Sequence, residues 1–341
     1  KVAAPVAGIT SMKNHVVDGC VEGHCDCMFM LNTYRWDFPI LSALIAPRPQ
    51  LILNTDNDRI FPLDGVVDVY TKARAIYKML DQETNLGLAI YEGPHKDTQP
   101  LRVPAFHWFE RHLKGKKIDH EMENTVAPKI FEPEELKVLK ETPGNERNTI
   151  IDDYFTHRVP RKQKVPESLD DWNAQHALTL SRLKSKSFRG WPANPGELSA
   201  TLDTQKSKEG LTLSVHSFNS QAAVRLPFYV IHNEKLKPED LELVVLNVLD
   251  EEGWNDFLES TGAAFFESLP DEELPELNAD RFNEERDMLL NRKWGMVYFP
   301  PRGIGPTAWT PDPKEQTHIR RRFALLGQTL DGMRVWDIRR S

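Results

Sequence analysis

Residues 49–62 read PQLILNTDNDRIFP, and residues 88–97 read LAIYEGPHKD. Each stretch starts as a short apolar run, which is typical of a strand, and ends in turn-forming residues. Asp58 lies in the first turn, and His95 lies in the second. A carboxylate and an imidazole therefore follow two successive predicted strands.

Helical periodicity surrounds these two strands. Apolar residues recur at helical spacing over 66–80 and again over 100–114. The run VAAPVAG at 2–8 is short and apolar, as in a buried strand. Strands that alternate with helices predict a parallel sheet with crossover connections, so we expect Asp58 and His95 at the same edge of that sheet.

These two residue types suit acid–base chemistry on a serine. A serine hydroxyl is a poor nucleophile at neutral pH and needs a base, which in turn needs an orienting carboxylate. Histidine can take up and return a proton near neutral pH, so His95 suits the base and Asp58 the orienting acid. Asp56 and Asp64 are rivals for the role of Asp58. In a purely structural interpretation, Asp58 is a turn residue and His95 a loop residue.

Residues 1–115 resemble the last third of an α/β-hydrolase of the acetyl xylan esterase and prolyl oligopeptidase kind. The resemblance rests on NDRIFP after a strand, GPHKD after the next strand, and PLRVPAFHWFERHLKG in the final helix. A D-x-x-[VF]-P pattern after a strand marks the acid in such enzymes, although here the NTDN turn replaces the glycine that often precedes this Asp. The resemblance implies that Asp58 is the acid and His95 the base of a Ser-His-Asp triad.

In that family the chain order is nucleophile, acid, base, with the serine on a G-x-S-x-G turn. The serine is therefore expected before residue 50. No G-x-S-x-G occurs among the 341 residues, and the chain starts at Lys1 in an apolar run. We therefore expect a piece of a longer protein, with the serine outside this chain and the missing remainder of its own polypeptide as a partner.

The pattern changes after residue 117. Residues 118–205 are polar and rich in proline, and apart from short helices expected over 167–187 they are interpreted as a connector. Periodicity then returns in apolar stretches that predict four strands, at 211–218, 223–231, 241–249 and 295–299. Helices are predicted around 253–266, 281–293 and 315–340.

Residues 206–341 resemble the first half of a second α/β-hydrolase unit. VVLNVLDEEGW stands at the usual place of an oxyanion-hole loop, and VYFPPRGIGPTAW resembles the D-x-R-G-x-G-x-S loop of these families. The sequence departs from the family pattern in two ways. Pro300 replaces the usual acidic residue, and no HGG-type turn is present. The predicted fold class is α/β: incomplete α/β-hydrolase sheets, of mostly parallel strands with flanking helices, joined by an irregular connector. The predicted domains are residues 1–117, 118–205 and 206–341.

Composition narrows the classes of function. The formal net charge of −8 disfavours a nucleic-acid binder, which usually carries a basic stripe. The sequence has no apolar run of about 18 residues, so no membrane span is predicted. An N-terminus without Met leaves the compartment open, and the resemblance slightly favours a periplasmic or extracellular location.

A dense group of thiols and imidazoles follows the first predicted strand, formed by His15, Cys20, His24, Cys25 and Cys27. Such ligands bind zinc, but their spacing matches no zinc module, so no metal is predicted. The preferred interpretation is a structured loop over the active site, and plain packing is the alternative. In an oxidising compartment Cys20 could also pair with Cys25 or Cys27.

Aromatic residues are the remaining candidates for contact with a substrate. Trp36 and Phe61 are predicted to line the substrate site. The other tryptophans considered are predicted to be core or interface anchors, with a carbohydrate platform as the alternative: Trp172, Trp191, Trp254, Trp294 and Trp309. Arg302, Gly303 and Gly305 either shape a rim in the second unit or form a turn, and no catalytic role is assigned to them.

The preferred function is hydrolysis of carboxylic esters through a Ser-His-Asp triad, without a cofactor. The resemblance implies acetylated plant or algal polysaccharide fragments as substrates. A serine peptidase of the prolyl oligopeptidase type would use the same Asp58 and His95. The third alternative is a non-catalytic, hydrolase-like binding or structural domain.

Overall fold

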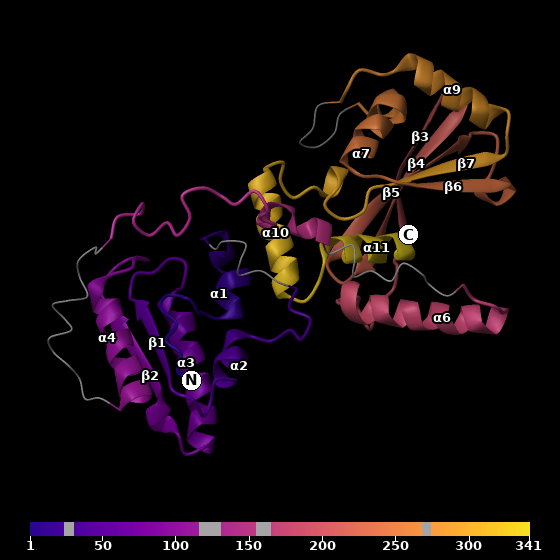
Figure 1. Ribbon diagram of the computed structural model, residues 1–341. Coiled ribbons are helices and arrows are strands. Elements are labelled where there is room, and N and C mark those ends of the chain that lie inside the picture. Colours follow the sequence, from indigo (N-terminus) through magenta and orange to yellow (C-terminus); the bar gives the residue numbers. More distant parts are fainter. Residues whose placement is uncertain (24–30, 116–130, 155–164, 268–273) are drawn as a thin grey trace. The chain divides into compact units, whose positions relative to one another are not determined.

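The computed structural model describes residues 1–23, 31–115, 131–154, 165–267 and 274–341 (Figure 1). The chain divides into two compact units. The first unit comprises Lys1–Asp26 and Trp36–Arg182, and the second comprises Cys27–Arg35 and Leu183–Ser341. In the described residues, none of the helices has the length and apolar character needed to cross a bilayer.

The first unit contains a two-stranded parallel sheet. Strand β1 (Gln50–Thr55) pairs in parallel with β2 (Leu86–Tyr91), with Gln50 opposite Leu86 and Thr55 opposite Tyr91. Every residue of β1 is buried, as expected for a strand covered on both faces. Residues 2–7 run along the other edge of β1, because Ala3 and Val6 form parallel bridges to this strand. The parallel pairing predicted for this half of the chain is confirmed.

Helices α3 (Leu63–Met79) and α4 (Gln99–Phe109) flank this sheet (Figure 1). Leu101 and Ala105 of α4 pack on Leu51 and Leu53, whereas Ala73 and Tyr77 of α3 pack on Leu86. These residues lie on the apolar faces from which both helices were predicted. The unit also contains α1 (Met12–Val16), α2 (Phe38–Ala43) and α6 (Leu169–Arg182).

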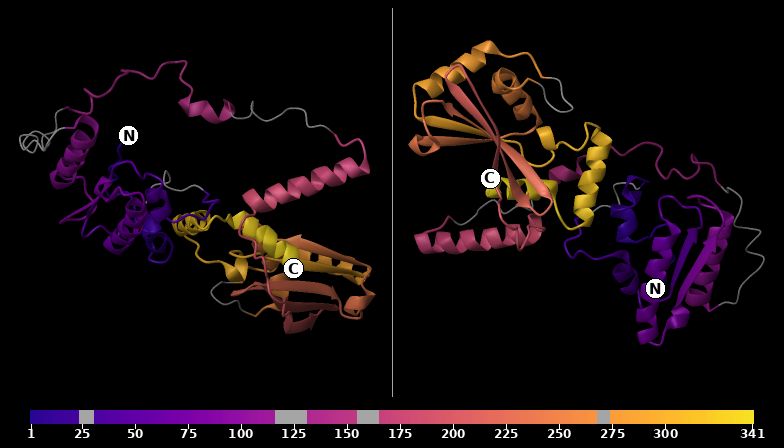
Figure 2. Two further views of the ribbon diagram at one scale, coloured as in Figure 1. Left: turned by 90° about the horizontal axis from the view of Figure 1, so that it is seen from below. Right: turned by 180° about the vertical axis from the view of Figure 1, so that it is seen from behind.

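The second unit contains a five-stranded sheet in the order β3-β4-β5-β7-β6. The strands are β3 (Thr201–Lys208), β4 (Leu211–Gln221), β5 (Val224–Asn233), β6 (Leu243–Val248) and β7 (Trp294–Phe299). Four of them were predicted from apolar runs, and β3 was not, because all eight of its residues are exposed and show no alternation. The strands twist relative to one another, as Figures 1 and 2 show.

The expectation of mostly parallel strands is wrong for this main sheet. Three of its pairs, β3–β4, β4–β5 and β5–β7, are antiparallel, and only β6–β7 is parallel. For β3–β4 and β4–β5 the reason lies in the connections, because two-residue hairpins can join only antiparallel strands. Glu209-Gly210 and Ala222-Ala223 are such hairpins, and Gly210 and Ala223 both have positive φ. The protein is therefore a mixed α/β structure.

The core of the second unit forms between this sheet and its helices. Helices α7 (Glu251–Phe257), α8 (Ala263–Phe265) and α9 (Ala279–Leu290) contribute buried aromatic residues to one cluster with Tyr229 of β5, on which Trp254 and Phe257 of α7 pack directly. The helix predicted over 315–340 is two helices, α10 (Pro313–Leu325) and α11 (Leu330–Arg340). Gly327 between them has φ of +72°, a left-handed conformation that ends α10.

Candidate active site

Asp58 and His95 meet at the carboxyl ends of β1 and β2. Asp58 follows β1 by three residues, and His95 follows β2 by four. Oδ2 of Asp58 lies 2.8 Å from Nδ1 of His95. The pairing follows from the parallel register, since Thr55 and Tyr91 at the strand ends are direct neighbours. Two residues 37 positions apart are thus joined by a side-chain hydrogen bond.

The Asp58 carboxylate is fully enclosed and its oxygens are engaged. The side chain has no exposed surface. Oδ1 accepts hydrogen bonds from the backbone N–H groups of Ile60 and Phe61, at 2.8 and 2.9 Å, which leaves Oδ2 for His95. A buried charge is tolerated when it is paired and hydrogen-bonded in this way. The arrangement fixes both the position of the carboxylate and the oxygen that it offers to the imidazole.

His95 combines a held nitrogen with an accessible one. Its side chain is 43% exposed, whereas that of Asp58 is enclosed. The ring stacks on Phe61, with centroids 5.7 Å apart and planes 28° from parallel. A carboxylate at Nδ1 favours the tautomer with hydrogen on Nδ1, which leaves Nε2 as a proton acceptor. Among the described residues, no side chain forms a hydrogen bond with Nε2.

Neither rival carboxylate takes this place. Oδ1 of Asp56 accepts a hydrogen bond from the backbone N–H of Gly93, at 3.0 Å. Asp64 lies in the first turn of α3 and accepts from Nδ2 of Asn14, at 3.2 Å. The carboxylate that pairs with His95 is that of Asp58.

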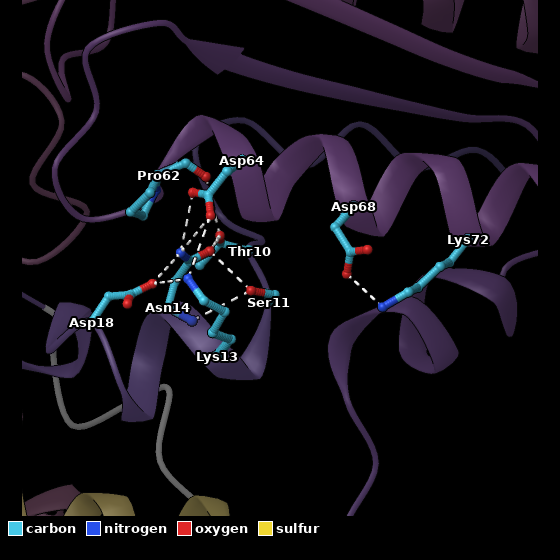
Figure 3. Close-up of polar contacts among 9 residues, drawn as sticks. All are labelled: Thr10, Ser11, Lys13, Asn14, Asp18, Pro62, Asp64, Asp68 and Lys72. Atoms are coloured by element: carbon cyan, nitrogen blue, oxygen red, sulfur yellow. Dashed lines mark hydrogen bonds and ion pairs between the residues drawn. The ribbon is translucent and has the colours of Figure 1, made fainter.

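The loop that carries Asp58 is anchored to α1 by buried polar side chains (Figure 3). Oγ1 of Thr10 donates to Oδ1 of Asn14, at 2.7 Å, and lies 3.2 Å from the carbonyl oxygen of Pro62. Asn14 also accepts from Ser11 and donates to Asp64. Sequence reasoning missed this network, because its polar residues have no periodic pattern and meet only in the folded chain.

A pocket of about 360 Å³ opens beside His95. Its apolar wall comes from α4 and from residues 4–7, and includes Leu101, Phe106 and Phe109. Its polar edge is formed by His95 with Lys96, Asp97 and Arg102. Arg102 and Asp97 are joined by an ion pair of 2.8 Å.

The two aromatic candidates lie in different surroundings. Phe61 is only 4% exposed, and its backbone and ring hold Asp58 and His95. Trp36 is partly buried beside Asp37, the residue that caps α2. Contact of either residue with a substrate stays a prediction.

The thiol-rich segment is described only in part. Cys20 is buried and has a free thiol, and burial raises its pKa. His15 is buried against Phe38, with ring centroids 4.8 Å apart. His24, Cys25 and Cys27 lie outside the described residues. Within the ranges given above, no three His, Cys, Asp or Glu side chains are arranged to hold a metal ion.

The chain has a distant likeness to a protein of known structure. No family model and no curated protein matches the sequence. Among solved structures, a putative acetyl xylan esterase from Bacteroides fragilis is similar, with a TM-score of 0.38 and 13% sequence identity. The match covers 59% of this chain and 50% of that protein, so the matched part spans about half of its length.

Proposed function

We propose that Asp58 and His95 are the acid and the base of a Ser-His-Asp ester hydrolase. The observation that carries the proposal is the 2.8 Å contact between Oδ2 of Asp58 and Nδ1 of His95. An enclosed carboxylate bound to one imidazole nitrogen, with the rest of that ring accessible, is the arrangement that a general base needs.

In this reaction Nε2 of His95 takes the proton of a serine hydroxyl while the serine oxygen attacks the ester carbonyl. The tetrahedral intermediate then expels the alcohol, which receives that proton from Nε2. Water deacylates the serine by the same two steps, and the acid leaves. Asp58 stabilises the imidazolium throughout and holds the ring orientation. The serine is the group that the sequence prediction places outside residues 1–341.

The proposed substrates are acetylated carbohydrates, the class implied by the sequence resemblance. The pocket beside His95 supports a site for a small acyl group, because its wall along α4 is apolar while its edge is polar. No cofactor is required for this chemistry.

The test is the hydrolysis of an aryl acetate by the full-length natural polypeptide. His95→Ala and Asp58→Asn should each lower kcat by about 10³-fold or more, whereas His176→Ala should not. His176 is a matched control because it is an exposed histidine that stacks on Trp172. Labelling with a fluorophosphonate, followed by peptide mapping, locates the serine.

Several outcomes would contradict the proposal. If correctly folded His95→Ala protein keeps wild-type turnover, His95 is not the base. If the natural polypeptide shows neither turnover nor labelling, it is not a serine hydrolase. Cleavage of a proline anilide in preference to the aryl acetate would replace the ester hydrolase with a peptidase.

A further inference from the structure

A second pocket, of about 480 Å³, lies within the second unit and is lined by four cationic side chains. These are Arg35, Lys184, Arg189 and Arg339, and no carboxylate belongs to the lining. Among the described residues, none of the four has a carboxylate partner within ion-pair distance. A concentration of unpaired positive charge stands out in a chain of net charge −8. We name it the basic aromatic pocket.

Aromatic rings form the other part of this lining. Trp191 stacks on Phe188, with centroids 5.3 Å apart and planes 13° from parallel, and lies 5.5 Å from Trp336. The guanidinium carbon of Arg339 lies 4.9 Å from the centre of the Trp191 ring. Aromatic faces and cations therefore lie side by side in one concave surface.

The rings of this pocket are held in place before any ligand binds. Nε1 of Trp191 donates to the carbonyl oxygen of Gly332 at 2.7 Å, and Nε1 of Trp336 donates to that of Ser220 at 3.0 Å. Gly190, next to Trp191, has φ of +113°, and a Cβ there would lie 2.4 Å from Cγ of Gln328. A preorganised site loses less side-chain entropy on binding.

We propose that the basic aromatic pocket binds an acidic saccharide, in which a carboxylate or sulfate group pairs with the arginines and the sugar ring packs on the aromatic residues. The negative charge of the ligand follows from the cations of the pocket, and its volume lies in the range of small-molecule sites. The saccharide class rests on the proposed function. A nucleic-acid strand is disfavoured by the negative net charge of the chain.

The test is titration of the full chain with trigalacturonate, and xylotriose and ATP are the comparison probes. Binding is measured by calorimetry and by tryptophan fluorescence. Trigalacturonate should bind, and its affinity should fall as NaCl is raised. Xylotriose should bind at least about tenfold more weakly, because it has no anionic group to pair with the arginines.

Matched arginine variants sharpen the test. Arg189→Gln and Arg339→Gln should each weaken trigalacturonate binding roughly tenfold, the effect of one charged hydrogen bond. Arg292→Gln is the control and should leave the affinity unchanged. Arg292 is an exposed arginine of the same unit that lies 4.4 Å over Trp294, outside this pocket.

The proposal is overturned if trigalacturonate binds no better than xylotriose, or if Arg292→Gln weakens binding as much as Arg339→Gln. Binding of ATP without binding of trigalacturonate would make the site one for nucleotides and would also overturn it. The aryl acetate used to test the esterase carries no acidic group. If trigalacturonate does not bind, the esterase proposal is therefore unaffected. If the esterase test fails, a measured binding of trigalacturonate still shows that the pocket binds anions.

Discussion

Oδ1 of Asp56 accepts a hydrogen bond from the backbone N–H of Gly93, and this 3.0 Å contact joins the loop after β1 to the loop after β2. Two more bonds join the loop after β2 to the end of β1 and to the loop that follows it. The N–H of Asn57 donates to the carbonyl oxygen of Gly93 at 3.1 Å, and Oγ1 of Thr55 donates to that of Pro94 at 3.1 Å. The loop that carries His95 is thus held beside Asp58 by groups other than the acid–base pair.

Substitution by asparagine separates the two aspartates. Asp56→Asn keeps an oxygen that can accept from Gly93, so aryl acetate turnover by the full-length natural polypeptide should stay within about tenfold of wild type. Asp58→Asn should lower kcat by about 10⁴-fold, because the amide does not stabilise the imidazolium and favours the wrong tautomer. Equal losses in steady-state kinetics of the two variants would show that Asp58 has no special role.

Gly65 in the first turn of α3 leaves no room for a side chain. A Cβ at this position would lie 1.7 Å from Oδ1 of Asn14 and 2.8 Å from the backbone nitrogen of Ser11. Gly65→Ala should therefore lower the free energy of unfolding by about 1–3 kcal/mol. The nearby Gly8→Ala is the control, because its Cβ would meet only an ordinary contact of 3.6 Å. Urea denaturation of the two variants compares them, and equal stability would contradict the close approach of Gly65 to Asn14 and Ser11.

Arg302 forms a buried ion pair with Asp337 of α11. Nε and one terminal nitrogen of the guanidinium donate to the two carboxylate oxygens, at 2.8 and 2.7 Å. Oγ of Ser220 donates to the same carboxylate at 2.5 Å. The side chains of Arg302 and Asp337 are 7% and 0% exposed. The ion pair therefore fastens the loop after β7 to α11, and a place for Arg302 in an active-site rim stays a prediction.

Removal of one partner from this ion pair should lower the free energy of unfolding more than removal of both partners. Asp337→Leu leaves the guanidinium buried without its carboxylate, so the free energy of unfolding should fall by about 3–5 kcal/mol. The double variant Arg302→Met and Asp337→Leu leaves neither charge and should recover part of that loss. Urea denaturation of the single and double variants measures the coupling, and purely additive losses would show that the pair does not act as a unit.

His216 of β4 makes the stability of the second unit sensitive to mild acid. Burial lowers the pKa of its imidazole, which stacks on Phe228, and this outweighs the opposing effect of Asp203. The folded state therefore favours the neutral ring, whereas the unfolded chain takes up a proton near the usual pKa of about 6.5. The stabilisation that neutral His216 gives the folded state is complete above a pH of about 6.5. It is lost as the pH falls toward the lowered pKa of His216 in the folded state.

His216→Phe keeps a ring on Phe228 and removes the titration. The difference in Tm between variant and wild type should therefore shift in favour of the variant as the pH falls from 7.5 to about 5.5. Thermal unfolding of both proteins over this pH range gives the comparison. Taking the difference in Tm cancels the effects of other groups that titrate in both proteins. A difference that does not change with pH would mean that His216 titrates alike in the folded and unfolded states.

Parts of this fold were predictable because their signals are local. β1 and β2 are buried runs, and α3 and α4 carry apolar faces, so their periodicity placed Asp58 and His95 after neighbouring parallel strands. The topology of the second sheet was not predictable in this way. It depends on a fully exposed strand, β3, and on two-residue hairpins whose conformation a hydrophobic pattern does not report.

The fine structure of the candidate site was also beyond the sequence. The sequence pattern favoured Asp58 over Asp56 as the acid, but it did not report the contacts that separate them, of Asp58 with His95 and of Asp56 with Gly93. The burial of Phe61 behind the imidazole likewise arises only when the two loops meet. Such contacts between residues far apart in the chain leave no periodic signature.

The most direct test of the acid–base pair is NMR of the His95 imidazole, labelled with ¹⁵N in the full chain. We expect the neutral ring to carry its hydrogen on Nδ1, with a downfield proton resonance that Asp58→Asn abolishes and Asp56→Asn preserves. A neutral ring protonated on Nε2, or a Nδ1 proton that is indifferent to Asp58→Asn, would contradict the pairing on which the proposed function rests.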